Sequence, residues 1–270
     1  MVAVTATSST AAPARGRTRR GGARWGRWVI LLFAAAYFLI PLYAAFAFAV
    51  SGPDGVGVFT GIGGKEGFLD AFSLSMTLAL ITLVITLVLM VPTAIWVHLR
   101  LPRVQRLFES ITILPIVIPP VVLIVGVLEV APGTLKGTPI LLALLYAVLA
   151  MPFAYRSLDA GLRSIPLTTL VEASRSLGGG WTTTMVRVLL PNLRSSLLSA
   201  TVLTVALVLG EYTMATLDQY ETFPVWIVVF DQDDAHVSVA VSLLSLVATW
   251  FLLLLISLID TRRVRRTGDS

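Results

Sequence analysis

Long apolar runs limit what this chain can fold into more than any other feature. Six of them approach the roughly 20 apolar residues that a helix needs to cross the hydrocarbon core of a bilayer. They cover residues 28–50, 71–97, 108–131, 139–155, 196–216 and 235–259. Only 13% of the 270 residues are charged and 56% are hydrophobic, whereas soluble domains are about one quarter charged. The sequence therefore predicts an all-α, polytopic membrane protein with six transmembrane helices.

The first apolar run follows a basic segment, as a signal peptide would. The apolar part of a signal peptide is only about 7–15 residues long, and residues 28–50 are longer. We interpret this run as a retained helix. The preceding residues 1–27 are rich in Ala, Thr, Gly and Arg, a composition that favours a disordered tail.

Arginine positions predict the orientation of the spans. Every arginine lies in one of four segments: residues 1–27, 98–107, 156–195 and 260–270. The intervening loops 51–70, 132–138 and 217–234 hold only Lys65 and Lys136 as basic residues. Loops rich in Lys and Arg stay in the cytoplasm, so both termini are predicted to be cytoplasmic. The basic clusters are interpreted as setting topology, and nucleic acid is excluded as a partner.

The outer loop 217–234 is acidic and partly apolar. Its acidic residues are Asp218, Glu221, Asp231, Asp233 and Asp234. They could attract a cationic solute or a basic partner, or they could simply be tolerated where arginines are excluded. The apolar run Phe223–Phe230 in this loop is too short to cross a bilayer, so it is interpreted as interfacial or re-entrant.

The longest inner segment, residues 156–195, is predicted to form a helical hairpin. The stretch "LTTLVEASRSLG" places its apolar residues on one helical face, and three glycines at 178–180 end that helix. A second amphipathic helix is predicted from "WTTTMVRVLL", which Pro191 breaks or bends before the fifth span. A structured inner hairpin of this kind indicates a docking surface for a partner.

The hairpin carries a specific pattern of residues. The pattern consists of Glu172, Ala173 and Ser174, then Gly178 six residues after the glutamate, and later Leu190 and Pro191. This pattern resembles the signature loop of permease subunits of binding-protein-dependent ABC importers, which begins Glu-Ala-Ala, has a glycine at this spacing and closes with a leucine–proline pair. Ser174 departs from the usual second alanine, and Gly179 from the alanine that often follows the glycine. Both changes exchange one small residue for another.

The resemblance extends from about residue 71 to residue 259, and it implies a type I ABC importer permease. In that family the loop docks into a cleft of a separate cytoplasmic ATPase dimer. On this view Glu172 offers a charge to a basic group of the ATPase. Ala173 and Ser174 keep the helix surface flat, and Gly178 permits the turn. Gly179, Leu190 and Pro191 complete the ATPase-coupling set.

Further partners and a location follow from the same resemblance. They are a second permease subunit, homologous or identical to this one, an extracellular solute-binding protein, and the lipid bilayer of a bacterial inner membrane. ATP and Mg are expected on the ATPase. This chain lacks a phosphate-binding "GK[ST]" sequence, so it is expected to be a transport subunit without cofactor or catalytic residues. It also has no cysteine and no cluster of residues suited to a metal.

Solute identity rests on a narrower resemblance. The segments "GEYTMATLDQYETFPVWIVVF" and "LPIVIPP" resemble permeases of the spermidine/putrescine group. Relatives of that group move ferric iron, thiamine and aminoethylphosphonate. The resemblance implies a polyamine-like solute.

Candidate solute-pathway residues lie within the spans. In residues 71–97, Ser75, Thr82, Thr86 and Thr93 share one helical face. Such a stripe either packs helices closely or lines a polar path. Glu211 is the one acid well inside a predicted span, with Thr204 on nearly the same face, and an intramembrane acid is a functional candidate.

Prolines predict a broken third span. Pro115, Pro119 and Pro120 each remove a backbone donor, so residues 108–131 must kink, either as a gate hinge or as a fixed bend. Pro119 and Pro120 join the pathway set, and His98 at an inner boundary is interpreted as a surface residue. Two other classes remain open: a self-contained secondary transporter or channel, which would show internal repeats, and an intramembrane enzyme, which would need an acid–base cluster.

Overall fold

The computed structural model describes residues 22–231 and 234–267, with side chains described for residues 28–230 and 234–251. The chain divides into two units, residues 1–45 and 46–270. Helix α1 (Gly22–Val50) is 29 residues long and supplies the described part of the first unit. Within the described ranges every regular element is a helix, as the apolar runs predict.

The second unit contains the remaining elements. Its long helices are α2 (Phe68–Arg100), α5 (Pro139–Ser164), α9 (Arg194–Gly210) and α12 (Ala235–Thr267). Its shorter elements are η1 (Gly55–Phe59), η2 (Ile62–Gly64), α3 (Gln105–Val117), α4 (Pro120–Val130), α6 (Leu167–Ser176), α7 (Trp181–Thr183), the π-helical turn η3 (Thr184–Leu189), α8 (Leu190–Asn192), α10 (Thr213–Leu217) and α11 (Phe223–Asp231).

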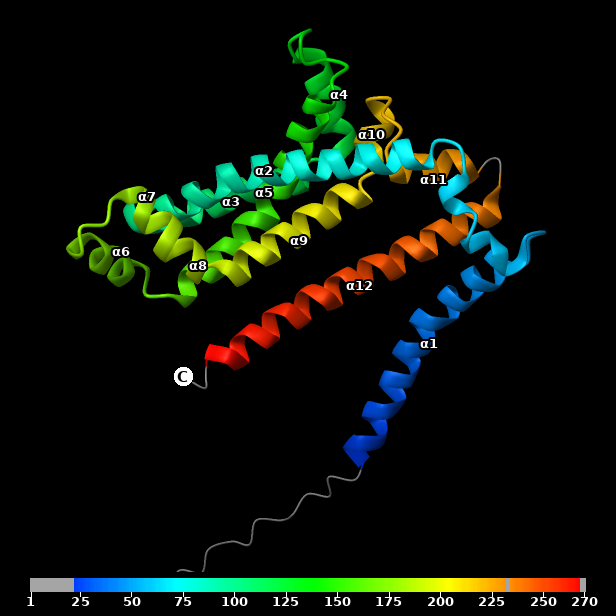
Figure 1. Ribbon diagram of the computed structural model, residues 1–270, viewed down its shortest axis with the longest axis horizontal. Coiled ribbons are helices and arrows are strands. Elements are labelled where there is room, and N and C mark those ends of the chain that lie inside the picture. The colour runs from blue at the N-terminus through cyan, green and yellow to red at the C-terminus, as the bar shows by residue number, and fades with distance from the viewer. Residues whose placement is uncertain (1–21, 232–233, 268–270) are drawn as a thin grey trace, which may run out of the picture. The chain divides into compact units, whose positions relative to one another are not determined.

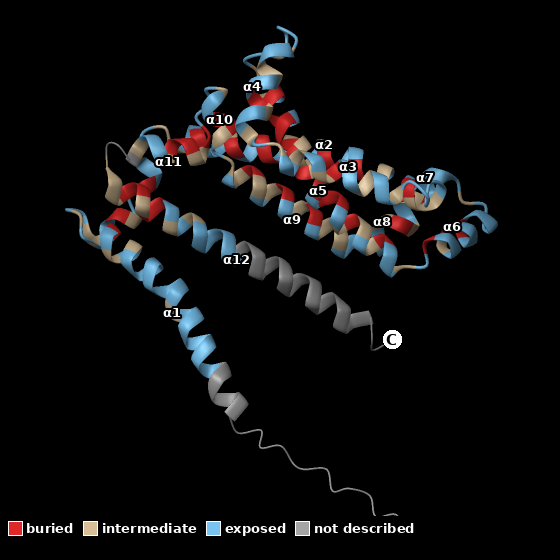
Figure 2. Ribbon diagram, turned by 180° about the vertical axis from the view of Figure 1, so that it is seen from behind, coloured by how far each residue is buried: buried red, intermediate tan, exposed pale blue. Residues whose placement is uncertain are grey.

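Helices α2, α5 and α9 lie side by side and form the centre of this unit (Figure 1). The contacting faces carry most of the buried residues (Figure 2). Small residues allow the helices to approach closely. At Gly161 of α5, a Cβ atom would overlap the side chain of Ser196 in α9, so α5 and α9 approach each other closely at this glycine.

Two apolar clusters occupy opposite ends of the three-helix centre. One joins the first half of α2 and α5 to α4 and α10 through Leu78, Ile124, Leu142 and Met214. The other joins their second halves to α6 and η3 through residues such as Ile95, Leu158, Val171 and Leu189. The segment α6–α8 is therefore fastened to the end of α2 and α5 that lies away from α10 and α11 (Figure 1).

By length and composition, three described helices can cross a membrane: residues 28–50, α2 and α5. Two bent pairs also qualify if each counts as one span, namely α3 with α4 and α7–α8 with α9, which gives up to five. In α12, the part with described side chains is a shorter apolar helix, Ala235–Phe251. α5 begins at Pro139, where the fourth span was predicted to begin, but it continues to Ser164 into the segment predicted as loop.

The proline-rich third run is broken rather than gently kinked. α3 ends at Val117, α4 begins at Pro120, and the two axes differ by 93°. Ile118 and Pro119 between them have extended backbone, with ψ angles of 122° and 135°. Two successive prolines cannot donate to the preceding turn, and the first disfavours helix at Ile118. A new helix therefore starts with Pro120 at its first turn.

The apolar run Phe223–Phe230 forms most of α11, which packs against α2 and α12. Trp226 is buried, and its indole Nε1 donates to the Glu66 carbonyl at 2.9 Å. The backbone N–H of Phe223 donates to Ser75 Oγ at 2.7 Å. This short helix is thus a packed part of the second unit.

Candidate functional site

The predicted hairpin is present as residues 167–192, which we call the 167–192 hairpin. Its first arm, α6, buries Leu167, Val171 and Ser174 and exposes Glu172 and Ala173. No ion pair involves the Glu172 carboxylate within the described part of the chain. The arm therefore anchors itself by one face and presents a free acid beside a flat, small residue on the other.

Gly178 makes the turn between the arms. Its φ angle is +80°, a left-handed conformation that glycine adopts without steric cost. The Gly178 N–H donates to the Arg175 carbonyl at 2.9 Å, and the Gly179 N–H donates to the Ser174 carbonyl at 2.8 Å. These two bonds form a Schellman motif with glycine at C′, as expected of a helix that ends at this glycine.

A buried hydroxyl pair joins the two arms. Ser174 Oγ lies 2.8 Å from Thr184 Oγ1, and Thr184 Oγ1 donates to the Gly180 carbonyl at 3.0 Å. Because the Thr184 hydrogen is used in that bond, Ser174 is the donor to Thr184. The serine at this position is therefore more than a small residue, since its hydroxyl connects α6 to η3.

Gly179 is tied to the same serine. A Cβ atom at Gly179 would lie 2.6 Å from Ser174 Oγ and 2.7 Å from the Ser174 carbonyl oxygen. Neither distance is compatible with ordinary packing. An alanine at position 179 would therefore not be a neutral exchange in this hairpin, and the two departures from the family pattern lie in direct contact.

The second arm ends differently from the prediction. Pro191 lies inside α8, and the axis turns by 77° only at Leu193, before α9. The N–H of Leu190 donates to the Met185 carbonyl, a bond across one residue more than in an α-helix. This wider turn precedes the proline that lacks a donor. Leu189 and Leu193 are buried, so the arm is seated in the core at the bend.

A cleft of about 420 Å³ separates the first arm from the end of α2. The α2 side contributes Trp96, Leu99 and Arg100; the hairpin contributes Thr168, Val171, Glu172, Arg175 and Trp181. The cleft thus offers two indole rings and charges of both signs, which suits contact with side chains of another protein. Trp96 and Trp181 were not predicted as site residues, because neither belongs to the pattern of residues on which the family resemblance rests.

The predicted hydroxyl stripe of α2 faces the protein interior. Ser75, Thr82 and Thr86 are buried, and so is Thr204 of α9. Thr82 Oγ1 donates to the Ala143 carbonyl of α5 at 3.2 Å. Thr93, farther along α2, bonds to its own helix at the Leu89 carbonyl. In this single chain the stripe lies between packed helices, and its role in a solute path stays a prediction.

Glu211 lies at a helix break. α9 ends at Gly210, and the Glu211 carboxylate accepts hydrogen bonds from the backbone N–H groups of Met214 and Ala215 at 2.9–3.3 Å. It thereby satisfies free donors at the start of α10. The acid predicted inside a span is thus a capping residue in this structure.

His98 was predicted to be a surface residue, and the structure shows that this prediction is wrong. Its side chain is only 9% exposed and lies 3.0 Å from Asp159 Oδ1. The two residues are 61 positions apart, and no local pattern connects them.

Of the acidic outer-loop residues, Asp231 and Asp233 lie outside the residues with described side chains, and so do the arginines of both tails.

Comparisons with known proteins match the chain to one family. The model of the family described as "Binding-protein-dependent transport system inner membrane component" matches residues 90–268, more than half of the chain. The chain is also 26% identical over 205 residues to the probable transport system permease protein NifC of Clostridium pasteurianum. That alignment covers 68% of this chain and 71% of the relative.

Proposed function

The chain belongs to the family of inner membrane components of binding-protein-dependent transport systems, and we propose that its 167–192 hairpin couples it to a separate cytoplasmic ATPase. In this proposal ATP-driven closure of an ATPase dimer pushes the hairpin, and the movement reorients the spans. The chain forms the solute pathway together with a second permease subunit, identical or homologous. It receives solute from an extracellular binding protein at the inner membrane of a bacterium.

One observation carries this proposal: Glu172 is exposed and has no ion-pair partner among the described residues, on a hairpin whose opposite face is fixed in the core. Val171 and Leu189, from the two arms, belong to the same apolar cluster as Leu158 of α5. A force on the exposed face would therefore reach α5 and α2 rather than bend a loose loop. A docking surface that transmits movement needs both features.

For the solute, we propose a polyamine or a substrate of related carriers, such as ferric iron, thiamine or aminoethylphosphonate. The support is the resemblance of residues 210–230 and 114–120 to spermidine/putrescine permeases. Binding measurements on the partner binding protein would decide between these compounds.

The coupling proposal is tested by co-purification from detergent with a co-expressed ATPase subunit. Glu172→Arg reverses an exposed charge and breaks no ion pair among the described residues, so the variant is expected to insert normally and to lose most of the ATPase. Glu172→Gln removes the charge without reversing it and is expected to retain an intermediate amount. The amount of ATPase bound per permease, measured on stained gels, is the readout.

Ser164→Arg serves as the matched control. Ser164 is exposed in the same inner segment, and its hydroxyl bonds only to the Gly161 carbonyl of its own helix. This variant introduces the same arginine side chain before Pro166 rather than on the docking face, and it should bind ATPase like the wild type. Equal binding by Glu172→Arg and wild type would refute the docking role, and the self-contained transporter would then become the leading function.

A further inference from the structure

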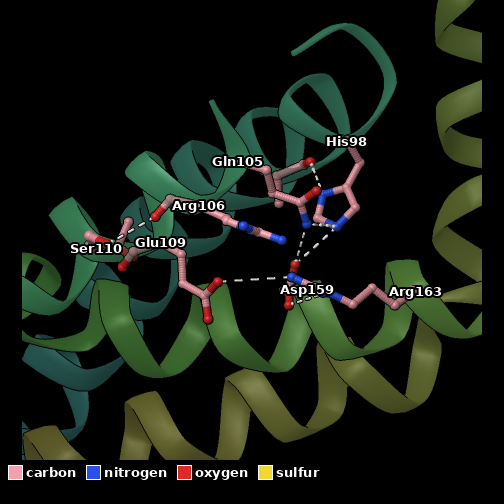
Figure 3. A network of polar contacts seen from close by, with 9 residues as sticks. His98, Gln105, Arg106, Glu109, Ser110, Asp159 and Arg163 are labelled. Atoms are coloured by element: carbon pink, nitrogen blue, oxygen red, sulfur yellow. Dashed lines mark hydrogen bonds and ion pairs between the residues drawn. The ribbon is translucent and has the colours of Figure 1, made fainter. Parts of the chain in front are cut away.

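A compact polar network lies beside the hairpin, where the end of α2 meets α3 and α5 (Figure 3). Gln105 of α3 is at its centre: its Nε2 lies 2.9 Å from Asp159 Oδ1 and 2.9 Å from His98 Nε2. Asp159 also accepts from Arg163 Nε at 2.8 Å, and Arg163 lies 3.9 Å from Glu109 of α3. Residues from three helices thus meet at one carboxylate.

The central bonds of the network are shielded from solvent. The side chains of His98 and Asp159 are 9% and 13% exposed, whereas those of Arg163 and Glu109 are 56% and 38% exposed. Exposed ion pairs contribute little to stability, so the bonds among His98, Gln105 and Asp159 are the ones that hold the helices. An aromatic contact supports them, because the Phe108 and Tyr155 rings lie 5.1 Å apart between α3 and α5.

The hydrogen bond from Gln105 to Asp159 forms in either charge state of the His98 imidazole. His98 Nδ1 lies 2.9 Å from the Ala94 carbonyl and must carry a hydrogen there. A neutral ring accepts at Nε2 from the Gln105 amide, which donates its second hydrogen to Asp159. A charged ring donates from Nε2 to Asp159 at 3.0 Å and can no longer accept from Gln105. The bond between Gln105 and Asp159 remains.

Its position links the hairpin to the broken third span. Asp159 and Arg163 lie on the last two turns of α5, directly before α6 begins at Leu167. α3 leads in the other direction to the 93° break at Pro119. Beyond that break α4 packs against α10, and Ile124 joins it to the apolar cluster of Leu78 and Leu142. Among the described residues, the hydrogen bonds around Asp159 do not extend past the break.

We propose that His98, Gln105 and Asp159 are positioning residues that make α3 move as one body with α5 and the 167–192 hairpin. Movement of the hairpin then appears as a change of angle at Ile118–Pro119. The part of this inference that concerns ATP-driven movement rests on the proposed function. The part that concerns the rigid connection of α3 to the hairpin does not.

Spin-label distances test both parts in the full chain, which has no native cysteine. One pair of labels on Ser110→Cys and Ser176→Cys reports α3 against α6. A second pair on Thr134→Cys and Ser176→Cys reports the loop after α4 against α6. All three positions are exposed. Without other substitutions, the distances between labels 110 and 176 should form one narrow distribution. This distribution should stay unchanged when the bound ATPase receives a non-hydrolysable ATP analogue. The distance between labels 134 and 176 should shift under the same conditions.

Variants that break the network should lose the narrow distribution. Gln105→Leu and Asp159→Leu are expected to broaden the 110–176 distances without nucleotide, and Asp159→Asn, which keeps an acceptor for Gln105, should preserve most of the wild-type shape. Ser157→Ala on α5, whose hydroxyl bonds only to the Phe153 carbonyl, is the control and should change nothing.

Two results would overturn the inference: narrow distributions in both leucine variants, or a wild-type 110–176 shift as large as the 134–176 shift. Failure of wild type to bind any ATPase would instead refute the proposed function. In that case the nucleotide-free widths still decide whether the network holds α3 to the hairpin.

Discussion

At the residue scale, the Glu211 carboxylate has a measurable task in the fold. It accepts from the N–H groups of Met214 and Ala215, at 2.9 Å for the shortest bond. Loss of a capping side chain typically costs about 1 kcal/mol, so Glu211→Ala should lower the thermal unfolding midpoint in detergent. Glu211→Gln keeps an acceptor oxygen and should lose less. An unchanged midpoint in Glu211→Ala would mean that the cap contributes nothing to the fold.

Asp218 predicts a pH dependence of stability. Its Oδ2 atom is buried without a hydrogen bond among the described residues, and burial raises the pKa of this carboxyl above its usual value. A raised pKa means that the folded state loses stability as the carboxyl ionises with rising pH. Asp218→Asn should therefore raise the thermal midpoint at neutral pH, and its advantage should shrink toward about pH 4, near the usual pKa of aspartate.

Asp234→Asn is the comparison for that measurement. Asp234 Oδ1 accepts from the N–H groups of His236 and Val237 at 3.1 and 3.2 Å, so this carboxylate has partners that stabilise it. Its replacement should not raise the midpoint at neutral pH. A rise of equal size in both variants would attribute the effect to total charge rather than to the burial of Asp218.

Residue roles were predictable from sequence only where the partner is local. The exposed face of α6 and the glycine stop follow from helical periodicity and from the conformational freedom of glycine. The bond between Thr82 and Ala143 joins residues 61 positions apart, and the pair His98–Asp159 is equally distant. Such contacts depend on how helices pack, which a single sequence does not encode in any short pattern.

At the scale of the element, the three glycines of the hairpin should differ sharply from one another. Gly178→Ala meets no neighbouring atom but must adopt a φ of +80°, which costs about 1–2 kcal/mol for an L-residue. Gly179→Ala places a methyl group against Ser174. Gly180 has a φ of −72° and open space around it, so Gly180→Ala should be nearly neutral. Thermal unfolding of the three variants measures these differences.

The double variant Gly179→Ala with Ser174→Ala refines that series. It removes the hydroxyl at 2.6 Å but leaves the Ser174 carbonyl oxygen at 2.7 Å, so only part of the loss should return. Full recovery would show that the hydroxyl alone excludes alanine at position 179. A destabilised Gly180→Ala variant would contradict the geometry of the turn.

Helix breaks were predictable in kind but not in place. The prolines at 119 and 120 signalled an interruption, and the chain breaks there because two donors are lost in succession. Pro191 gave the same signal, yet the bend comes at Leu193, and a π-helical turn comes directly before the proline. The local surroundings of a proline decide whether it ends a helix or is accommodated within one.

At the scale of the whole molecule, apolar length and basic charge give different kinds of information. Length identifies three spanning helices and two bent pairs among the described residues, so the count depends on whether a bent pair crosses the bilayer. Arginine placement assumes that α3 with α4 does cross, since only then does each basic segment fall on one side. The six-span prediction and the predicted orientation therefore both require that the broken pair α3–α4 crosses the bilayer.

Single-cysteine labelling in intact cells tests that assumption, because the chain has no cysteine of its own. The four positions Thr60, Val104, Thr134 and Ser176 are exposed and uncharged, so their replacement leaves the charges that set topology untouched. A membrane-impermeant thiol reagent should label Thr60→Cys and Thr134→Cys directly, and Val104→Cys and Ser176→Cys only after permeabilisation. Labelling of Thr134→Cys and Val104→Cys from the same side would mean that α3 and α4 form a re-entrant loop. Direct labelling of Ser176→Cys would place the hairpin outside the cell, where no cytoplasmic ATPase can reach it.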